Sequence, residues 1–188
     1  ALQYAKVQLG NNQYEACLKT LEKTQIIPFE GSIQGKYVFE QANIQLAIDL
    51  MNKKKYKEAL EKLEKSKEWP ENLGVGVPFE PDNRMQDYLE ALCLDKLGRK
   101  KEAIEQRNAV LEYTKTHYDD LSPTFNNIFA LKVLQQLGET DATNSLIQKI
   151  KDSDQYSKPI PRRVVAWFTN DIDTCTKLKK NIYFSFIK

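Results

Sequence analysis

The sequence predicts an all-α protein built from antiparallel helical hairpins that follow one another along the chain. Two recurring patterns predict this fold class. A small residue with apolar neighbours returns about every 40 residues, and Leu-Gly pairs return between segments of helical periodicity. The length of 188 residues is enough for about four to five such hairpins. Hydrophobic and charged fractions of 41% and 29% are typical of globular chains.

The recurring small residue marks the second helix of each predicted hairpin. Four segments contain it, at Cys17, Ala59, Ala103 and Ala142, which are spaced by 42, 44 and 39 residues. A leucine follows four positions later in three of them, whereas Arg107 takes that place after Ala103. A larger side chain would hold two crossing helices apart beyond the usual distance of about 8 to 10 Å. We therefore expect helices to cross at these small residues.

Each predicted hairpin turns at a glycine or at a lysine-rich segment. Leu-Gly pairs end periodic apolar stretches at Gly10, Gly98 and Gly138, and residues 53–55, all lysine, take the corresponding place in the second hairpin. Glycine just past a helix supplies the left-handed conformation that other residues adopt only with strain. The four turns are therefore expected near these positions.

These features together resemble the tetratricopeptide repeat family. The segment YKEALEKLEKSKEWP, residues 56–70, is the closest match, and the family's small residue on the first helix of a repeat falls on Ala47, Ala91 and Leu131. The resemblance covers roughly residues 1–151 and implies a right-handed solenoid of about four helical hairpins. The chain departs from the family at Asn43 and Asn127, where the family has a large aromatic residue, and in its longer repeat.

A segment rich in glycine and proline interrupts the repeats at residues 69–83, WPENLGVGVPFEPDN. Its two glycines and three prolines are not tolerated inside a helix, so a long loop is expected. Loops of this length often carry function, and the alternative is a plain connection between two hairpins.

The C-terminal part, residues 152–188, is expected to form a pair of capping helices. Pro159 and Pro161 punctuate the chain before it, and Asn170 or Asp171 is expected to open the second helix. That helix would present one apolar face, formed by Ile172, Cys175, Leu178, Ile182 and Phe186. A terminal element of this kind commonly caps a solenoid.

A second resemblance concerns the long loop and the helix that follows it. ENLGVGVPFEPDNR followed by YLEALCLDKLG is similar to the helical repeat region behind β-rich, carbohydrate-active-like domains in large secreted bacterial proteins. This resemblance implies that the chain is the C-terminal helical part of a longer polypeptide, with its own upstream domain as partner. The compartment stays open between the cytoplasm and export, since an export signal would then be missing from a chain that starts at Ala1.

Sequence signatures of catalysis or metal binding are not found. There is no nucleophile elbow, glycine-rich phosphate loop, zinc-protease motif or calcium loop, and the three cysteines are far apart with a single histidine, His117. His117, Glu80, Asp82 and the pair Asp119-Asp120 are interpreted as solvated or capping groups. We therefore assign no catalytic, cofactor-binding or metal-binding residue and do not expect an enzyme.

Charge and hydropathy limit the partners. Lys and Arg number 28 against 26 Asp and Glu, which disfavours a nucleic-acid binder, and no apolar stretch is long enough for a membrane span. The resemblance to tetratricopeptide repeats instead predicts a concave apolar groove for a protein or peptide, lined by Ile44, Ile48, Met51, Met85, Tyr88, Leu92, Phe125 and Ile128. The same set could also be ordinary core between helices.

The expected function is therefore a protein–protein interaction scaffold without catalysis. The alternative is an accessory helical domain of a larger glycan-processing enzyme whose catalytic domain lies upstream. No cofactor is expected in either case.

Overall fold

The fold is all-α throughout the part of the chain that the computed structural model describes, residues 1–28, 33–117 and 125–171. These residues form helices and short connections, without a strand. The predicted all-α class is thus confirmed for them, and the solenoid arrangement stays a prediction. The packing divides the chain into two compact units, residues 1–103 and 104–188, and each is described by itself.

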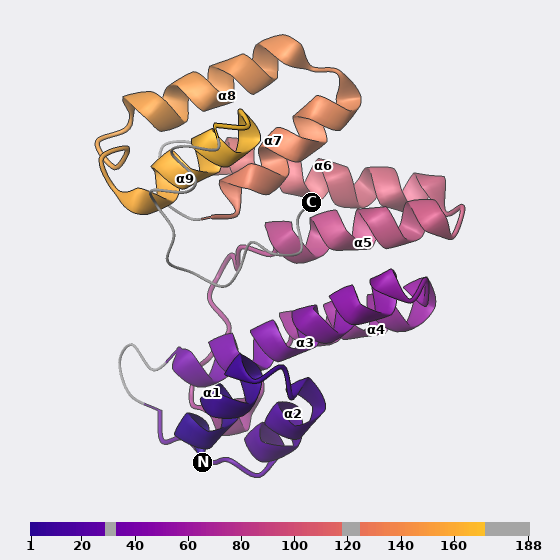
Figure 1. Ribbon diagram of the computed structural model, residues 1–188, viewed down its shortest axis with the longest axis vertical. Coiled ribbons are helices and arrows are strands. Elements are labelled where there is room, and N and C mark those ends of the chain that lie inside the picture. The colour runs from indigo at the N-terminus through magenta and orange to yellow at the C-terminus, as the bar shows by residue number, and fades with distance from the viewer. Residues whose placement is uncertain (29–32, 118–124, 172–188) are drawn as a thin grey trace. The chain divides into compact units, whose positions relative to one another are not determined.

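The first unit contains two complete helical hairpins and a fifth helix (Figure 1). Its helices are α1 (Leu2–Gly10), α2 (Tyr14–Glu22), α3 (Gln34–Asn52), α4 (Tyr56–Lys67) and α5 (Arg84–Lys96). Each helix packs against the next along the chain, and α1 also contacts α3. A short 3-10 helix, η1 (Glu71–Leu73), lies in the connection between α4 and α5.

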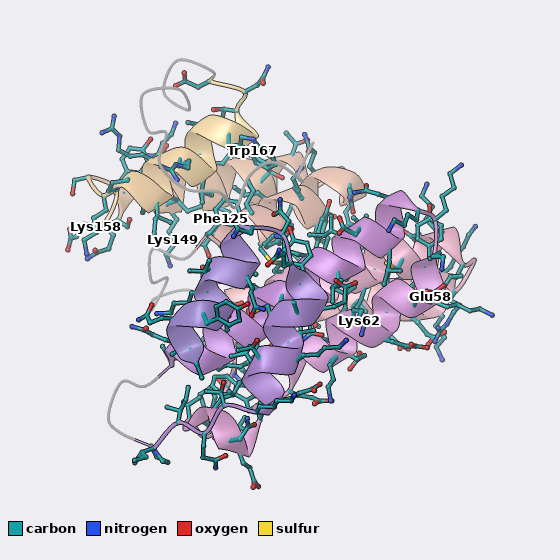
Figure 2. All side chains as sticks on the ribbon, turned by 60° about the horizontal axis from the view of Figure 1, so that its bottom comes forward. Glu58, Lys62, Phe125, Lys149, Lys158 and Trp167 are labelled. Carbon is teal, nitrogen blue, oxygen red and sulfur yellow. The ribbon has the colours of Figure 1, made fainter. Side chains whose placement is uncertain are left out.

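Amphipathic patterning explains why these segments are helices. In α4 the residues Ala59, Leu63 and Ser66 are buried on one face, while charged side chains such as that of Glu58 project outward (Figure 2). This spacing of three to four residues is the period of a helix with one face on the core.

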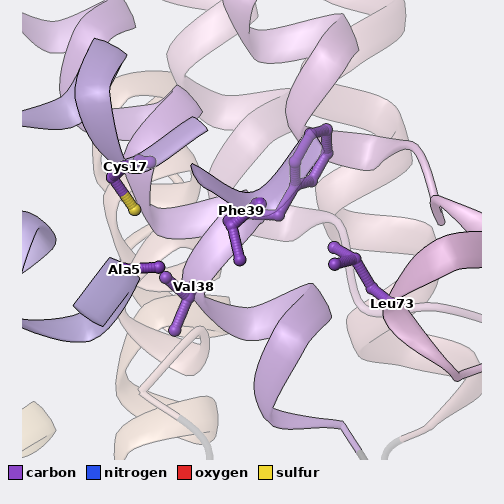
Figure 3. Close-up of a cluster of buried hydrophobic side chains, with 7 residues drawn as sticks. Ala5, Cys17, Val38, Phe39 and Leu73 are labelled. Atoms are coloured by element: carbon purple, nitrogen blue, oxygen red, sulfur yellow. The ribbon is translucent and has the colours of Figure 1, made fainter. Parts of the chain in front are cut away.

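The core of the first unit joins both hairpins to η1. Figure 3 shows Ala5 of α1, Cys17 of α2, Val38 and Phe39 of α3, and Leu73 of η1 gathered in one cluster. A buried side chain the size of Leu or Phe stabilises the fold by roughly 1.5 to 3 kcal/mol. Burial raises the pKa of the Cys17 thiol to about 11, so Cys17 stays neutral and acts as a small apolar residue.

The second unit begins within α6 (Lys100–Thr116) and continues with α7 (Asn127–Leu137), α8 (Thr140–Asp152) and α9 (Pro159–Phe168). Helix α7 packs against both α8 and α9, which also contact each other. The predicted boundary after residue 151 falls at the end of α8 and stays a prediction. Pro159 occupies the first position of α9, where a missing N–H is tolerated.

Every helical hairpin in the described chain turns in the same way. One residue adopts a positive φ, and the N–H of the next residue donates to a carbonyl five positions earlier, as in a Schellman motif. The residues with positive φ are Asn12, Lys54, Gly98 and Gly138, and the same geometry recurs at Asn170 after α9. The predicted turns at residues 53–55, Gly98 and Gly138 are therefore confirmed.

The first turn lies near Gly10 as predicted, but the residue that adopts the left-handed conformation needs a correction. Gly10 is the last residue of α1 and has no positive φ, whereas Asn12, with φ of 59°, takes the left-handed position two residues later. Asparagine tolerates this conformation better than other residues with a side chain, so the Leu-Gly pair was misleading here. At the other end, Asn170 has a positive φ after α9. The helix expected to open at Asn170 or Asp171, with its face from Ile172 to Phe186, lies outside the described residues.

The small residue of the fourth hairpin also needs a correction. Cys17, Ala59 and Ala103 are fully buried, each five residues after a left-handed residue. The residue at that distance from Gly138 is Thr143, which is buried, whereas Ala142 is exposed. Thr143 is accepted there because its hydroxyl donates a hydrogen bond to the carbonyl of Glu139 at 2.7 Å.

This correction predicts opposite results for two alanine substitutions. Ala59→Leu should destabilise the protein by about 1 to 3 kcal/mol, because the added volume separates packed helices. Ala142→Leu should change stability by less than about 0.5 kcal/mol, because the side chain enters solvent. Denaturant unfolding of both variants measures the difference, and equal effects would contradict the helix crossing assigned to Ala59.

Candidate protein-binding loop

The connection between α4 and α5, residues 68–83, carries the most exposed large apolar side chain among the described residues of the first unit, that of Phe79. We name this connection the α4–α5 loop. Phe79 is 97% exposed and Val77 67% exposed, and the backbone bends at Phe79 and Glu80. Pro78 and Pro81 flank this bend and fix their own φ angles. The α4–α5 loop therefore exposes the side chain of Phe79 to solvent at a bend of the backbone.

Asn72 of η1 fixes the base of the loop. Its side-chain amide donates to the carbonyl of Leu21 at 2.9 Å and to that of Thr24 at 2.8 Å. The carbonyl of Leu21 lies in the last turn of α2, where carbonyls have no partner within the helix, and that of Thr24 lies two residues after the helix ends. In return the carbonyl of Asn72 accepts the N–H of Ile26 at 2.9 Å. Three hydrogen bonds thus connect the α4–α5 loop to the end of α2 and to the connection that follows it.

Gly74 makes the closest backbone contact of this junction. It has φ of +76°, and a Cβ on it would lie 2.8 Å from the carbonyl oxygen of Ile26. Gly35, at the beginning of α3, lies against Leu73 of η1, since a Cβ on Gly35 would be 3.2 Å from Leu73. The junction therefore requires two residues without side chains.

Lys36 connects the end of α4 to α3. Its side chain is almost fully buried, and Nζ donates to the carbonyl of Ser66 at 2.6 Å and to Glu40 Oε2 at 2.9 Å. The same Nζ lies 5.0 Å from the ring centroid of Trp69, the second residue of the loop. This cation satisfies a carbonyl in the last turn of α4 and fixes the start of the loop.

A partly buried ion cluster connects the two helices on either side of the loop. Lys67, the last residue of α4, contacts Glu90 Oε2 at 2.8 Å and Asp87 Oδ1 at 2.9 Å, both on α5, and Glu64 Oε1 at 3.7 Å. Burial alone would lower the pKa of Lys67, but Asp87 and Glu90 raise it above its usual value. Burial raises the pKa of Glu90 to about 7, against the lowering effect of Lys67.

The end of the loop has an ion pair of its own. Arg84, the first residue of α5, donates from Nε and Nη2 to the two carboxylate oxygens of Asp82, each at 2.8 Å. Such a paired contact is geometrically specific and stronger than one between neutral groups. Between Lys67 and Arg84 the chain carries four acidic residues and no lysine or arginine, so the loop is acidic.

The eight predicted groove residues are distributed over both units. Five of them are buried, namely Ile44, Ile48, Met85, Tyr88 and Ile128. Met51 and Leu92 in the first unit and Phe125 in the second are half-buried. Phe125 packs edge-on against Phe129, with ring centroids 6.1 Å apart. This burial favours the core interpretation of the set, and the groove stays a prediction.

The remaining polar candidates take ordinary structural positions where they are described. His117 stacks on Tyr113, with ring centroids 3.9 Å apart, and its Nδ1 lies 3.0 Å from the Tyr113 carbonyl. Asp119, Asp120 and Cys175 lie outside the described residues. Among the residues described, no cluster of His, Cys, Asp or Glu is arranged to hold a metal ion, and no helix is long and apolar enough to cross a membrane.

Sequence reasoning located the loop but missed the residues that hold it. The sequence does not indicate the structural roles of Asn72, Lys36 and Glu90, because asparagine in a turn and charged residues in a helix are common. The clearest available signal was Gly74 directly after Asn72 and Leu73, since glycine after a short turn often has a positive φ. No protein-family model, curated protein or solved structure matches this chain.

Proposed function

We propose that this chain is a tetratricopeptide-like solenoid that binds another protein, without catalysis of its own, and that the α4–α5 loop is a main contact. The recurring hairpin turns and buried small residues support the solenoid, as does the packing of α2 on α3 and of α4 on α5. A solenoid whose repeats contact mainly their neighbours leaves the connecting loops available to partners.

The observation that carries the proposal is the 97% exposure of Phe79 on a loop with a fixed base. A phenylalanine in water forgoes the roughly 1.5 to 3 kcal/mol that burial would contribute. A partner with an apolar pocket recovers this energy on binding. Since Asn72 and the two ion pairs already order the base, little entropy remains to be lost there.

The charge of the loop supports a particular kind of pocket. The loop that carries Val77 and Phe79 contains Glu68, Glu71, Glu80 and Asp82 and no lysine or arginine. Two of these carboxylates pair with cations outside the loop, Glu68 with Lys65 and Asp82 with Arg84. Complementary charge steers association and selects among partners. The partner is accordingly proposed to have an apolar pocket bordered by lysine or arginine.

The alternative partner is a domain of the same polypeptide. The α4–α5 loop is also the segment that resembles the repeat region of large secreted bacterial proteins with a β-rich domain. In that version Phe79 docks on the upstream domain, and the helical unit is an accessory of a glycan-processing enzyme.

Phe79→Ala tests the loop directly. We expect the variant to lose captured partners, because aromatic anchors often contribute about 2 kcal/mol or more to an interface. Its stability should stay within about 0.5 kcal/mol of the parent, because the side chain makes few contacts. Affinity capture followed by mass spectrometry, together with thermal unfolding, measures both properties.

The matched control is Tyr4→Ala, which removes a 62% exposed aromatic residue from α1 in the same unit. Proteins captured by the parent and by Tyr4→Ala, but not by Phe79→Ala, identify the loop partners. An identical set for all three chains would remove the loop from the proposed function.

A further inference from the structure

We propose that the ion cluster between α4 and α5 is a proton-controlled latch for the α4–α5 loop, in which protonation of Glu90 tightens the base of the loop. The inference rests on the proposed function only in that it describes the regulation of the same loop. It is carried by the position, charge and burial of the cluster.

The cluster lies where it can act on both ends of the loop. Lys67 is the residue directly before the loop, and Asp87 and Glu90 stand in the first two turns of the helix directly after it. The ionic contacts of Lys67 with Glu90 and Asp87, at 2.8 and 2.9 Å, join the end of α4 to α5. Loosening these contacts therefore frees the start of α5 from the end of α4.

The charges of the cluster do not balance when every group is ionised. One ammonium, that of Lys67, faces three carboxylates, those of Glu64, Asp87 and Glu90, which leaves a net charge of −2. Asp82 adds to the negative potential at Asp87, although Arg84 pairs with it. The Cys93 thiol beside Glu90 stays neutral, because burial raises its pKa to about 12. Lys36 of α3 is engaged with Ser66 and Glu40.

Of the three carboxylates, Glu90 is the one for which the ionised form is least stable. Its side chain is only 2% exposed, compared with 14% for Asp87 and 67% for Glu64. Its second oxygen, Oε1, is buried without a hydrogen-bond partner in the described structure. An ionised carboxylate in such a place lacks both water and donors for one of its oxygens, so the neutral form is favoured.

The direction of the switch follows from the pKa of Glu90. Burial raises this pKa from 4.5 to about 7 in the folded protein. Between these two values the folded state holds a proton that a hydrated carboxyl does not, so the folded state gains stability as the pH falls through 7. An opened base, in which water reaches Glu90, is correspondingly favoured above pH 7.

Trp69 provides a local readout of the latch. It is the second residue of the loop, and Trp167 is the other tryptophan of the chain. In a Trp167→Phe background, Trp69 fluorescence is recorded between pH 5.5 and 8.5, and the thermal midpoint is measured at each pH. We expect a fluorescence transition with its midpoint near pH 7 and a thermal midpoint that falls as the pH rises through it.

Two variants decide whether Glu90 is responsible. Glu90→Gln should abolish the transition and keep the low-pH signal at every pH. Asp87→Asn should move the midpoint to lower pH, because one like charge has been removed. A transition that survives unchanged in Glu90→Gln, an unmoved midpoint in Asp87→Asn, or a parent chain without a transition would overturn the proposal.

The outcome is independent of the binding test, since no partner is needed for it. If the pH transition is absent, the binding result with Phe79→Ala is unaffected. If Phe79→Ala captures the same proteins as the parent, the pH transition is still tested by Glu90→Gln and Asp87→Asn.

Discussion

Gly74→Ala is expected to destabilise the first unit by about 3 kcal/mol, whereas Gly98→Ala should destabilise it by about 1 kcal/mol. The two glycines have nearly the same backbone conformation, with φ of +76° and +74°. Alanine at either position therefore meets the same left-handed strain. The two positions differ in their surroundings.

Steric contact makes the difference between these glycines. A Cβ at Gly74 would meet the carbonyl oxygen of Ile26 at 2.8 Å and its Cγ2 at 2.9 Å, whereas nothing lies within 4 Å of a Cβ at Gly98. Since one of the opposing atoms belongs to the backbone, relief requires that the two connecting loops separate. The hydrogen bond from Ile26 to Asn72 would weaken with them.

Denaturant unfolding of both variants measures the strain and the contact separately. The Gly98→Ala value gives the strain alone, and the excess for Gly74→Ala gives the contact with Ile26. Gly76→Ala is a further control in the same loop, because it has neither a positive φ nor a neighbour within 4 Å. Equal losses at residues 74 and 98 would show that the loops are not held together at Gly74.

The repeats could be predicted because their causes are local. A turn between two helices needs a residue that tolerates a positive φ, and glycine at residues 98 and 138 predicts where this residue lies. Asn12 and Lys54 adopt the same conformation although neither is a glycine. The left-handed residue of the first turn was therefore assigned to Gly10 instead of to Asn12. Likewise, Ala142 and Thr143 are both small, and only packing shows that Thr143 is the buried one.

The base of the loop could not be predicted because its contacts are distant in sequence. Asn72 binds carbonyls 51 and 48 residues earlier, and no periodic pattern records such a pairing. The burial of Glu90 also depends on another helix, since its charge is matched by Lys67, 23 residues earlier. Sequence could state that residues 69–83 form a loop, but not which side chains hold it.

The turn geometry of the helical hairpins recurs at the end of the described chain. Asn170 has φ of 60°, and the N–H of Asp171 donates to the carbonyl of Ala166 at 2.7 Å, as in the four earlier turns. Helix α9 therefore ends as α1, α3, α5 and α7 do. Cys175 follows Asn170 by the same five residues that separate Asn12 from Cys17, and it lies outside the described residues.

Lys67→Met is expected to destabilise the protein by about 3 to 5 kcal/mol at pH 8, because it leaves buried carboxylates without their cation. Asp87 and Glu90 would then face each other's charge with little water, at 14% and 2% side-chain exposure. Methionine retains most of the length and apolar volume of lysine, so the loss reports mainly on charge.

Lys65→Met is the matched control. Lys65 also stands in the last turn of α4 and pairs with Glu68 at 2.7 Å, but both side chains are about half exposed, at 53% and 52%. The favourable position of a cation at a helix C-terminus is thus lost in both variants. An exposed pair contributes only about 0 to 1 kcal/mol, so Lys65→Met should be nearly neutral.

The pH dependence separates charge from packing in this pair of variants. Lys67 lowers the pKa of both Asp87 and Glu90, so its removal raises both values further. Glu90 then holds a proton in the folded state at pH 5.5, so the destabilisation by Lys67→Met should be smaller there than at pH 8. Adding Glu90→Gln to Lys67→Met should recover much of the stability at pH 8. Denaturant unfolding of the parent and of each variant at pH 8 and at pH 5.5 measures these losses. A loss for Lys67→Met that is the same at both pH values would assign it to packing instead of to the charges of Asp87 and Glu90.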